Sequence, residues 1–127
     1  MKRTLFQVYV THSREAVARY QEAFDVEIMS SYLNKDGSYY HCELNIYGQI
    51  LAVSEHNEVS TCGNTMQLCL HFEKGEEALV QKAYEVLRNN AQILHALGPC
   101  DYCDFMTDLI DVYGVRWCLF VCGLAGN

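Results

Sequence analysis

Cys100 and Cys103 form the most recognisable chemical pattern in this chain. They are separated by two residues in the segment GPCDYCDF, the spacing found in zinc knuckles and thiol redox enzymes. A structural zinc site needs a second pair of ligands, and neither a second C-x2-C nor an H-x3-H follows. His95 lies five residues before Cys100, so a partial metal site stays open as an alternative.

The surroundings of this cysteine pair favour an ordinary loop. A thioredoxin-like pair begins a helix after a strand, whereas this pair falls between two predicted strands. The nearest cationic side chain before it is Arg88, and Asp101 and Asp104 lie close, which should raise the thiol pKa. We therefore predict that Cys100 and Cys103 are bonded neither to each other nor to a metal.

His41, Glu43 and His71 are a second candidate constellation. His41 and Glu43 are two residues apart on one predicted strand, so they share a face, and His71 lies on the same face of another strand. The three could bind a divalent metal or supply an acid–base pair. The alternative, which we favour, is that both histidines are bonded to neighbours on a half-solvated sheet.

Further side chains on the same predicted face could line a ligand pocket. Cys118 could act as a nucleophile beside a base, although a cysteine in a strand more often serves packing. Gln7 and Tyr9 could hydrogen-bond a ligand or form a wall. The predicted pocket residues are Gln7, Tyr9, His41, Glu43, Gln67, Cys69, His71 and Cys118.

Composition and charge exclude several classes of function. The chain has 127 residues, a net charge of −7 and an apolar fraction of 50%, which predict one globular domain, residues 1–127. No basic stripe offers contacts to nucleic acid, and no stretch is long enough to cross a membrane.

The cysteines are Cys42, Cys62, Cys69, Cys100, Cys103, Cys118 and Cys122. Their odd number and the predicted cytoplasmic location argue against a disulfide framework. Cysteines 42, 69, 118 and 122 lie in apolar or alternating runs, which predicts small buried side chains.

The elements that position these residues follow a repeated order. Alternation and helical spacing predict strand, helix and three strands twice, in modules of roughly 1–60 and 64–127. The first module is predicted over 4–10, helix 13–24, 26–33, 38–47 and 49–55, with Ser13 as helix cap. The second is predicted over 65–72, helix 75–87, 91–97, 105–113 and 115–121. Gly48 and Gly114 are predicted at matching hairpins.

Alternation also assigns the two faces of each strand. One set is apolar and should pack under the helices: Phe6, Val8, Val10, Cys42, Leu44, Ile46, Met66, Leu68, Leu70, Phe72, Trp117, Leu119 and Val121. Asp108 falls on this apolar side by the same count. The opposite face is polar. These observations predict an α+β fold with a curved mixed sheet around a cavity and helices on the outer face.

Three motifs resemble a known superfamily. RYQEAF (19–24), HCELNIYGQILAVS (41–54) and DVYGVRW (111–117) are similar to the PhnB-like group of the vicinal oxygen chelate superfamily. That superfamily includes glyoxalase I, extradiol dioxygenases, and fosfomycin and bleomycin resistance proteins, and its fold is the repeated βαβββ module. The resemblance implies a homodimer that binds a small molecule.

The resemblance also indicates where a metal would be bound. The superfamily's four ligand positions fall near Leu5, Ala52, Gln67 and Cys118, and leucine and alanine cannot ligate a metal. We therefore expect no metal at these positions and no cofactor, although a divalent metal held elsewhere stays possible. The leading hypothesis is a PhnB-like protein, of unassigned ligand, that binds a small molecule without metal. The alternatives are a metal-dependent lyase, isomerase or dioxygenase of this type, and a structural or regulatory dimer.

Overall fold

Tight hairpins at equivalent points organise the two halves of the chain. The computed structural model describes residues 1–56 and 65–122. Tyr47 and Gly48 connect two strands with φ of 52° and 96°, and Gly114, at φ 90°, lies in the matching turn of the second half. Such left-handed pairs favour tight antiparallel hairpins, and glycine adopts positive φ without strain. The predicted positions of both hairpins are confirmed.

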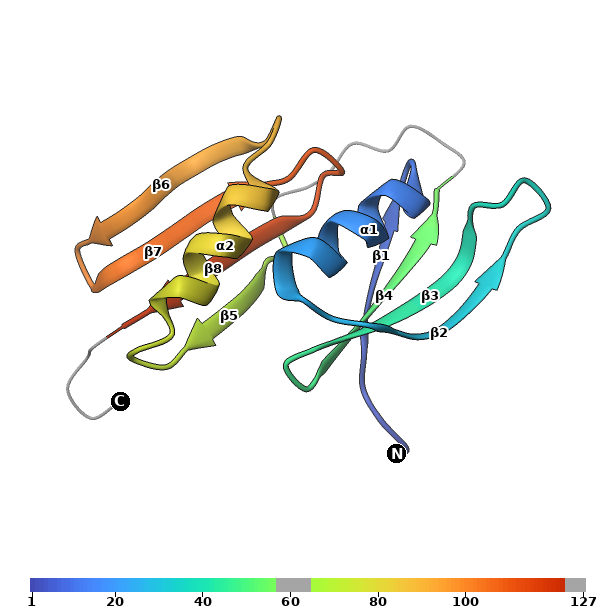
Figure 1. Cartoon of the computed structure of the whole chain (residues 1–127), viewed down its shortest axis with the longest axis horizontal. Helices are drawn as coiled ribbons and strands as arrows, with labels where there is room; N and C mark the ends of the chain where they lie inside the picture. The colour runs from blue at the N-terminus through green and yellow to red at the C-terminus, as the bar shows by residue number, and fades with distance from the viewer. Residues whose placement is uncertain (57–64, 123–127) are drawn as a thin grey trace. The chain divides into compact units, whose positions relative to one another are not determined.

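The first compact unit, Met1–Thr61, contains one helix and a four-stranded mixed sheet (Figure 1). Its elements are β1 (Phe6–Val10), α1 (Ser13–Phe24), β2 (Ile28–Leu33), β3 (Tyr39–Ile46) and β4 (Gln49–Glu55). The strand order is β1-β4-β3-β2, with β1 parallel to β4 and the other pairs antiparallel.

The second compact unit, Cys62–Asn127, repeats this arrangement. Its elements are β5 (Leu68–Phe72), α2 (Glu77–Leu87), β6 (Gln92–Cys100), β7 (Cys103–Ile110) and β8 (Arg116–Val121). The order is β5-β8-β7-β6, with β5 parallel to β8. The predicted α+β fold of two βαβββ modules is therefore confirmed. Each module contains one mixed sheet. The predicted module boundary at 60–64 lies outside the described residues. A single cavity shared by both modules stays a prediction.

Each helix buries one apolar stripe on its own sheet. α1 packs on β3 and β4, and α2 packs on β8. The buried helical residues follow the spacing of an amphipathic helix: Ala16, Val17, Tyr20, Ala23 and Phe24 in α1, and Val80, Ala83, Tyr84 and Leu87 in α2. Leu44, Leu51 and Val53 face the first stripe, and Trp117 and Leu119 lie in the core of the second module. Within the described residues, no helix has the length and apolar character needed to span a bilayer.

The structure corrects the predicted cap of α1. Ser13 is the first helical residue and not the cap, and its hydroxyl accepts a hydrogen bond from the Tyr39 amide at 2.9 Å. His12 occupies the cap position in a left-handed conformation. The carboxylate of Glu55, at the end of β4, accepts the His12 and Ser13 amides at 3.0 and 2.9 Å. A side chain distant in sequence therefore replaces the local cap.

The alternation rule fails at the starts of strands and in β7. Phe6 and Met66 were predicted to be buried, yet they are 44% and 70% exposed, because β1 begins at Phe6 and Met66 precedes β5. Asp108 was predicted on the helix side. It is paired with Cys118 of β8 on the opposite, polar face. Asp111, at the end of this strand, is instead the carboxylate in the core, where it accepts the Trp117 indole N–H at 2.9 Å.

Candidate functional site

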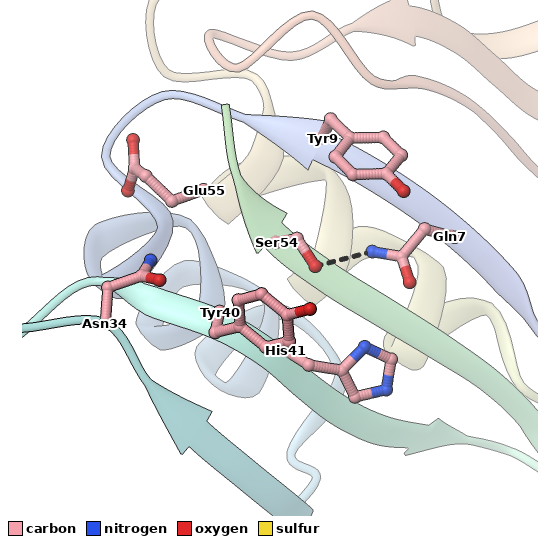
Figure 2. A pocket seen from close by; sticks show the side chains of 7 residues that line it. All are labelled: Gln7, Tyr9, Asn34, Tyr40, His41, Ser54 and Glu55. Atoms are coloured by element: carbon pink, nitrogen blue, oxygen red, sulfur yellow. Dashed lines mark hydrogen bonds between the residues drawn. The ribbon is translucent and has the colours of Figure 1, made fainter. Parts of the chain in front are cut away.

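A cavity of about 330 Å³ lies within the first module, over the ends of β1, β3 and β4 (Figure 2). Its lining is mostly polar, with two tyrosine rings. The lining residues are Gln7, Tyr9, Asn34, Tyr40, His41, Ser54 and Glu55. Of the predicted pocket residues, Gln7, Tyr9 and His41 therefore line this cavity, and Glu43 contacts it through His41.

The parallel pairing of β1 with β4 builds the floor of this pocket. Gln7 is opposite Ala52 and Tyr9 is opposite Ser54, so the four side chains share the face turned away from α1. The Gln7 amide donates to the Ser54 hydroxyl at 2.8 Å and to the Val8 carbonyl at 3.3 Å. Both hydrogens of that amide are thus donated within the protein, and Gln7 can offer a ligand its carbonyl oxygen.

Glu43 is the buried charge beside the pocket. Its two carboxylate oxygens accept from Arg3 Nη1 and Nη2 at 2.7 and 2.9 Å, and Oε2 also lies 2.8 Å from His41 Nε2. The hydrogen bonds from Arg3 and then from His41 lower the pKa of Glu43 to about 2. Because an ionised carboxylate only accepts, the His41 proton lies on Nε2, and in a neutral ring Nδ1 is an acceptor. His41 and Glu43, which were predicted as a pair from their spacing, are therefore hydrogen-bonded. Arg3 also bonds Glu43, and spacing along the strand could not predict that contact.

The two tyrosines supply the apolar surface of the pocket. Tyr9 and Tyr40 are 63% and 69% exposed, so their rings can contact a ligand. Figure 2 shows Tyr9 on one side of the Gln7–Ser54 bond and Tyr40 with His41 on the other. The Tyr9 ring also meets His56 edge-on, with ring centroids 6.2 Å apart. Glu55 borders the pocket, but its carboxylate is bonded to the start of α1.

The other predicted site residues lie on the polar face of the second module. Gln67 Nε2 donates to Asp108 Oδ1 at 2.9 Å, and the Cys69 thiol donates to Gln67 Oε1 at 3.3 Å. Arg116 forms a fork with Asp108, from Nε at 3.0 Å and Nη2 at 2.7 Å. Sequence reasoning missed Asp108 and Arg116 here. Asp108 is paired with Cys118 across β7 and β8. Knowledge of this strand register would have placed Asp108 on the same face as Cys118.

His71 and Cys118 differ in what surrounds them. His71 stacks on Phe120 in the second module, with ring centroids 4.4 Å apart, whereas His41 and Glu43 belong to the first. Cys118 is directly paired with Cys69 and is 9% exposed. Burial, together with the nearby Cys69 and Asp108, raises the pKa of Cys118 to about 12. Such a thiol is almost fully protonated at neutral pH, so its nucleophilicity is low.

The cysteines differ from prediction in their bonding, in their burial and in the loop that holds them. Cys103 and Cys122 form a disulfide with Cα atoms 4.9 Å apart, so the expectation of no disulfide was wrong. Cys122 is therefore not a simple packing residue, and Cys69, predicted to be buried, is exposed. The predicted loop around Cys100 shrinks to two residues, because Cys100 ends β6 and Cys103 begins β7. Cys42 and Cys118 are buried free thiols, as predicted.

The side chains at the four superfamily metal positions do not fit a divalent ion. Leu5 and Ala52 carry no donor atom, and the Gln67 amide is bonded to Asp108, so at most Gln67 and Cys118 could supply donors, fewer than the three or four that a divalent ion needs. In the described ranges, 1–56 and 65–122, no three His, Cys, Asp or Glu side chains are grouped so as to hold a metal.

Comparison with known proteins shows which solved structures share this fold. No family model and no curated protein sequence matches the chain. The chain is similar in structure to the PhnB protein from Bacillus cereus, with 23% identity, a TM-score of 0.79, and coverage of 95% of this chain and 100% of that one. It is also similar to protein PA1353 from Pseudomonas aeruginosa, at 14% identity, TM-score 0.79, and coverage of 95% and 98%.

A fosfomycin resistance protein has the same fold. FosX from Listeria monocytogenes matches at 14% identity with a TM-score of 0.71, covering 96% of this chain and 94% of that one. A mutant of FosX was solved as a complex with Mn(II) and a dihydroxypropylphosphonic acid. The chain therefore has the fold of PhnB-like and FosX proteins of the vicinal oxygen chelate superfamily, which confirms the resemblance in fold.

Proposed function

We propose that this protein binds a small molecule in the pocket of its first module, and that binding uses no metal at the superfamily's usual positions. The observation that carries the proposal is the pocket itself: two exposed tyrosine rings stand over a floor of hydrogen-bonded polar groups. Aromatic walls around a few placed polar groups are the common form of a small-molecule site. The solved PhnB protein and FosX support the proposal at the level of fold.

The lining favours a ligand with one flat ring and a hydrogen-bond donor. The volume of about 330 Å³ is at the small end for ligand pockets, so a one-ring molecule fits best. The Gln7 carbonyl and a neutral His41 ring would accept from the ligand. The negative charge of Glu43 is neutralised by Arg3, so the pocket does not require a cationic ligand.

The alternative is a lyase, isomerase or dioxygenase that uses a divalent metal. FosX supports it only by analogy of fold, because the Mn(II) complex was described for that protein. Leu5 and Ala52 argue against it here, because two of the four positions lack any donor atom. Binding that depends on added Mn(II) would favour the alternative.

The homodimer and the cytoplasmic location are further parts of this proposal. The homodimer is implied by the resemblance, and light scattering of the purified chain would test it. The Cys103–Cys122 disulfide is unusual for a reducing compartment, so the location needs its own measurement, such as fractionation of the producing cells.

The binding proposal is tested by calorimetric titration with a panel of one-ring aromatic amides, such as benzamide and nicotinamide, in buffer with chelator. At least one amide should bind, and Tyr9→Ala and Tyr40→Ala should each weaken binding by about tenfold, as expected for loss of an aromatic contact. Tyr47→Ala is the matched control, because Tyr47 is a comparably exposed tyrosine in the β3–β4 turn, 54% exposed, and does not line the pocket. Equal weakening by the control, or binding only with Mn(II), would contradict the proposal.

A further inference from the structure

Three cysteines meet at the closed end of the β6–β7 hairpin. Cys100 and Cys103 are directly paired across a turn of two residues, Asp101 and Tyr102. Opposite residues in antiparallel strands have Cα atoms about 4.5 to 5.5 Å apart, which is within the range that a disulfide spans. Cys103 is bonded to Cys122, with Cα atoms 4.9 Å apart. Cys103 therefore has two cysteines within bonding reach, and one of them, Cys100, is a free thiol.

The packing brings these sulfurs into one cluster. Cys103 forms a buried cluster with Met106 and Cys118, and Cys100 and Cys122 pack against that cluster. A register shift between Gly98 and Cys100 interrupts the alternation of the hairpin. Such a bulge lets Cys103 share a cluster with Met106, three residues later, although strict alternation would separate them.

Burial decides which thiol can reach the disulfide. Cys103 is 4% exposed, so a thiol in solution has little access to its sulfur, whereas Cys100 already packs against it. Cys118 is the other free thiol in the cluster. Its burial raises its pKa to about 12, so at neutral pH it provides almost no thiolate. Cys100 is the better attacking group.

We propose that Cys100, Cys103 and Cys122 form a thiol–disulfide exchange centre. The Cys100 thiolate attacks Cys103 Sγ, the Cys103–Cys122 bond breaks, and a Cys100–Cys103 disulfide forms across the turn. Cys122 leaves as a thiolate and takes up the proton that Cys100 lost. One thiol and one disulfide exist before and after, so the step needs no oxidant. The exchange moves the reactive thiol from the hairpin to the end of β8.

Trypsin separates the two forms cleanly, because it cuts after Arg88 and Arg116 and nowhere between them. Cys100 and Cys103 then lie on one peptide, and Cys118 and Cys122 on the next. The starting disulfide joins the two peptides, whereas the exchanged disulfide lies within the first. The protein is held without reductant at neutral pH, quenched with acid, blocked with N-ethylmaleimide in acidic denaturant, digested and analysed by mass spectrometry.

Both forms should be present in the native protein and in Cys118→Ser, and the exchanged form should be lost in Cys100→Ser. In Cys122→Ser, oxidised glutathione should produce the Cys100–Cys103 disulfide. This second experiment remains informative even if Cys100→Ser does not fold. Joined peptides alone in the native protein, or free or glutathionylated Cys100 and Cys103 in Cys122→Ser, would overturn the proposal.

Discussion

Arg3 holds both carboxylate oxygens of Glu43, at 2.7 and 2.9 Å, and so fixes the residue that orients His41. A two-pronged ion pair of this kind is stronger and more directional than a single contact. The ion pair with Arg3 gives the Glu43 carboxylate, which lies next to the pocket, a structural role. Glu43 therefore sets the direction of the His41 ring and is not available as a general base.

Replacing Glu43 should change how the free energy of unfolding depends on pH. The pKa of Glu43 lies at about 2 in the fold, below its ordinary value of 4.5, so its contribution is complete above about pH 4.5 and is lost as the pH falls toward 2. Glu43→Gln should cost on the order of 1 kcal/mol at pH 7, because Arg3 is partly exposed and solvent screens the pair. Urea unfolding at pH 7, 4 and 2.5 measures this. A cost that stays the same at all three pH values would show that the charge is not responsible.

Replacing Asp111 should destabilise the second module. Asp111 is buried, and its carboxylate accepts from the Trp117 indole at 2.9 Å and from the Tyr113 and Val115 amides at 2.9 and 3.0 Å. Asp111→Ala leaves these donors unpaired, which should cost about 2 to 4 kcal/mol. The fluorescence of Trp117, the single tryptophan of the chain, follows unfolding in urea. Asp104→Ala, at an exposed carboxylate in β7, the strand that precedes Asp111, should change the free energy of unfolding by less than about 0.5 kcal/mol.

Glu55 should stabilise the start of α1 from a distance. Its carboxylate accepts the His12 and Ser13 amides, as a capping residue would, and it places a negative charge at the positive end of the helix. Glu55→Ala should cost about 1 kcal/mol, with faster hydrogen exchange in the first turn of α1. Glu27→Ala, an exposed acid after this helix, is the matched control. Equal exchange in both variants would contradict the capping role.

The two cysteines of the C-x2-C pattern should differ in their effect on stability. Cys103 closes a 19-residue separation with Cys122, and a disulfide of that span contributes about 3 kcal/mol, whereas Cys100 is a free thiol. Cys103→Ser should therefore cost about 2 to 4 kcal/mol and Cys100→Ser less than about 1 kcal/mol in urea without reductant. With reductant, the native protein should fall to the level of Cys103→Ser. If reductant leaves the native protein unchanged, the disulfide does not stabilise the fold.

Sequence alone could predict what depends on local periodicity. Helical spacing placed α1 at its observed residues, and alternation placed β4, because both patterns are continuous and end at clear turns. Alternation failed where the register shifts. Cys103 shares a cluster with Met106 through a bulge, and Asp108 turned out to lie opposite Cys118.

The contacts that build the pocket connect residues far apart in the chain. Arg3 and Glu43 are 40 residues apart, and Gln7 and Ser54 are 47 residues apart. No local pattern encodes such pairs, because they arise only when β1 is placed parallel to β4. The types of Gln7, Tyr9, His41 and Glu43 indicated a polar face, but Asn34, Tyr40 and Ser54 join it only through the fold.

Chemical-shift mapping in the presence of a metal chelator tests most directly whether the first module binds a small molecule without metal. The labelled protein is titrated with the amide that binds in calorimetry, and the backbone amide signals are followed. We expect shifts concentrated at Gln7, Tyr9, Tyr40, His41 and Ser54, and the same shifts when the diamagnetic ion Mg(II) replaces the chelator. Shifts that appear only with the divalent ion, or that cluster around Gln67 and Cys118 instead, would show that binding is not metal-free or does not occur in this pocket.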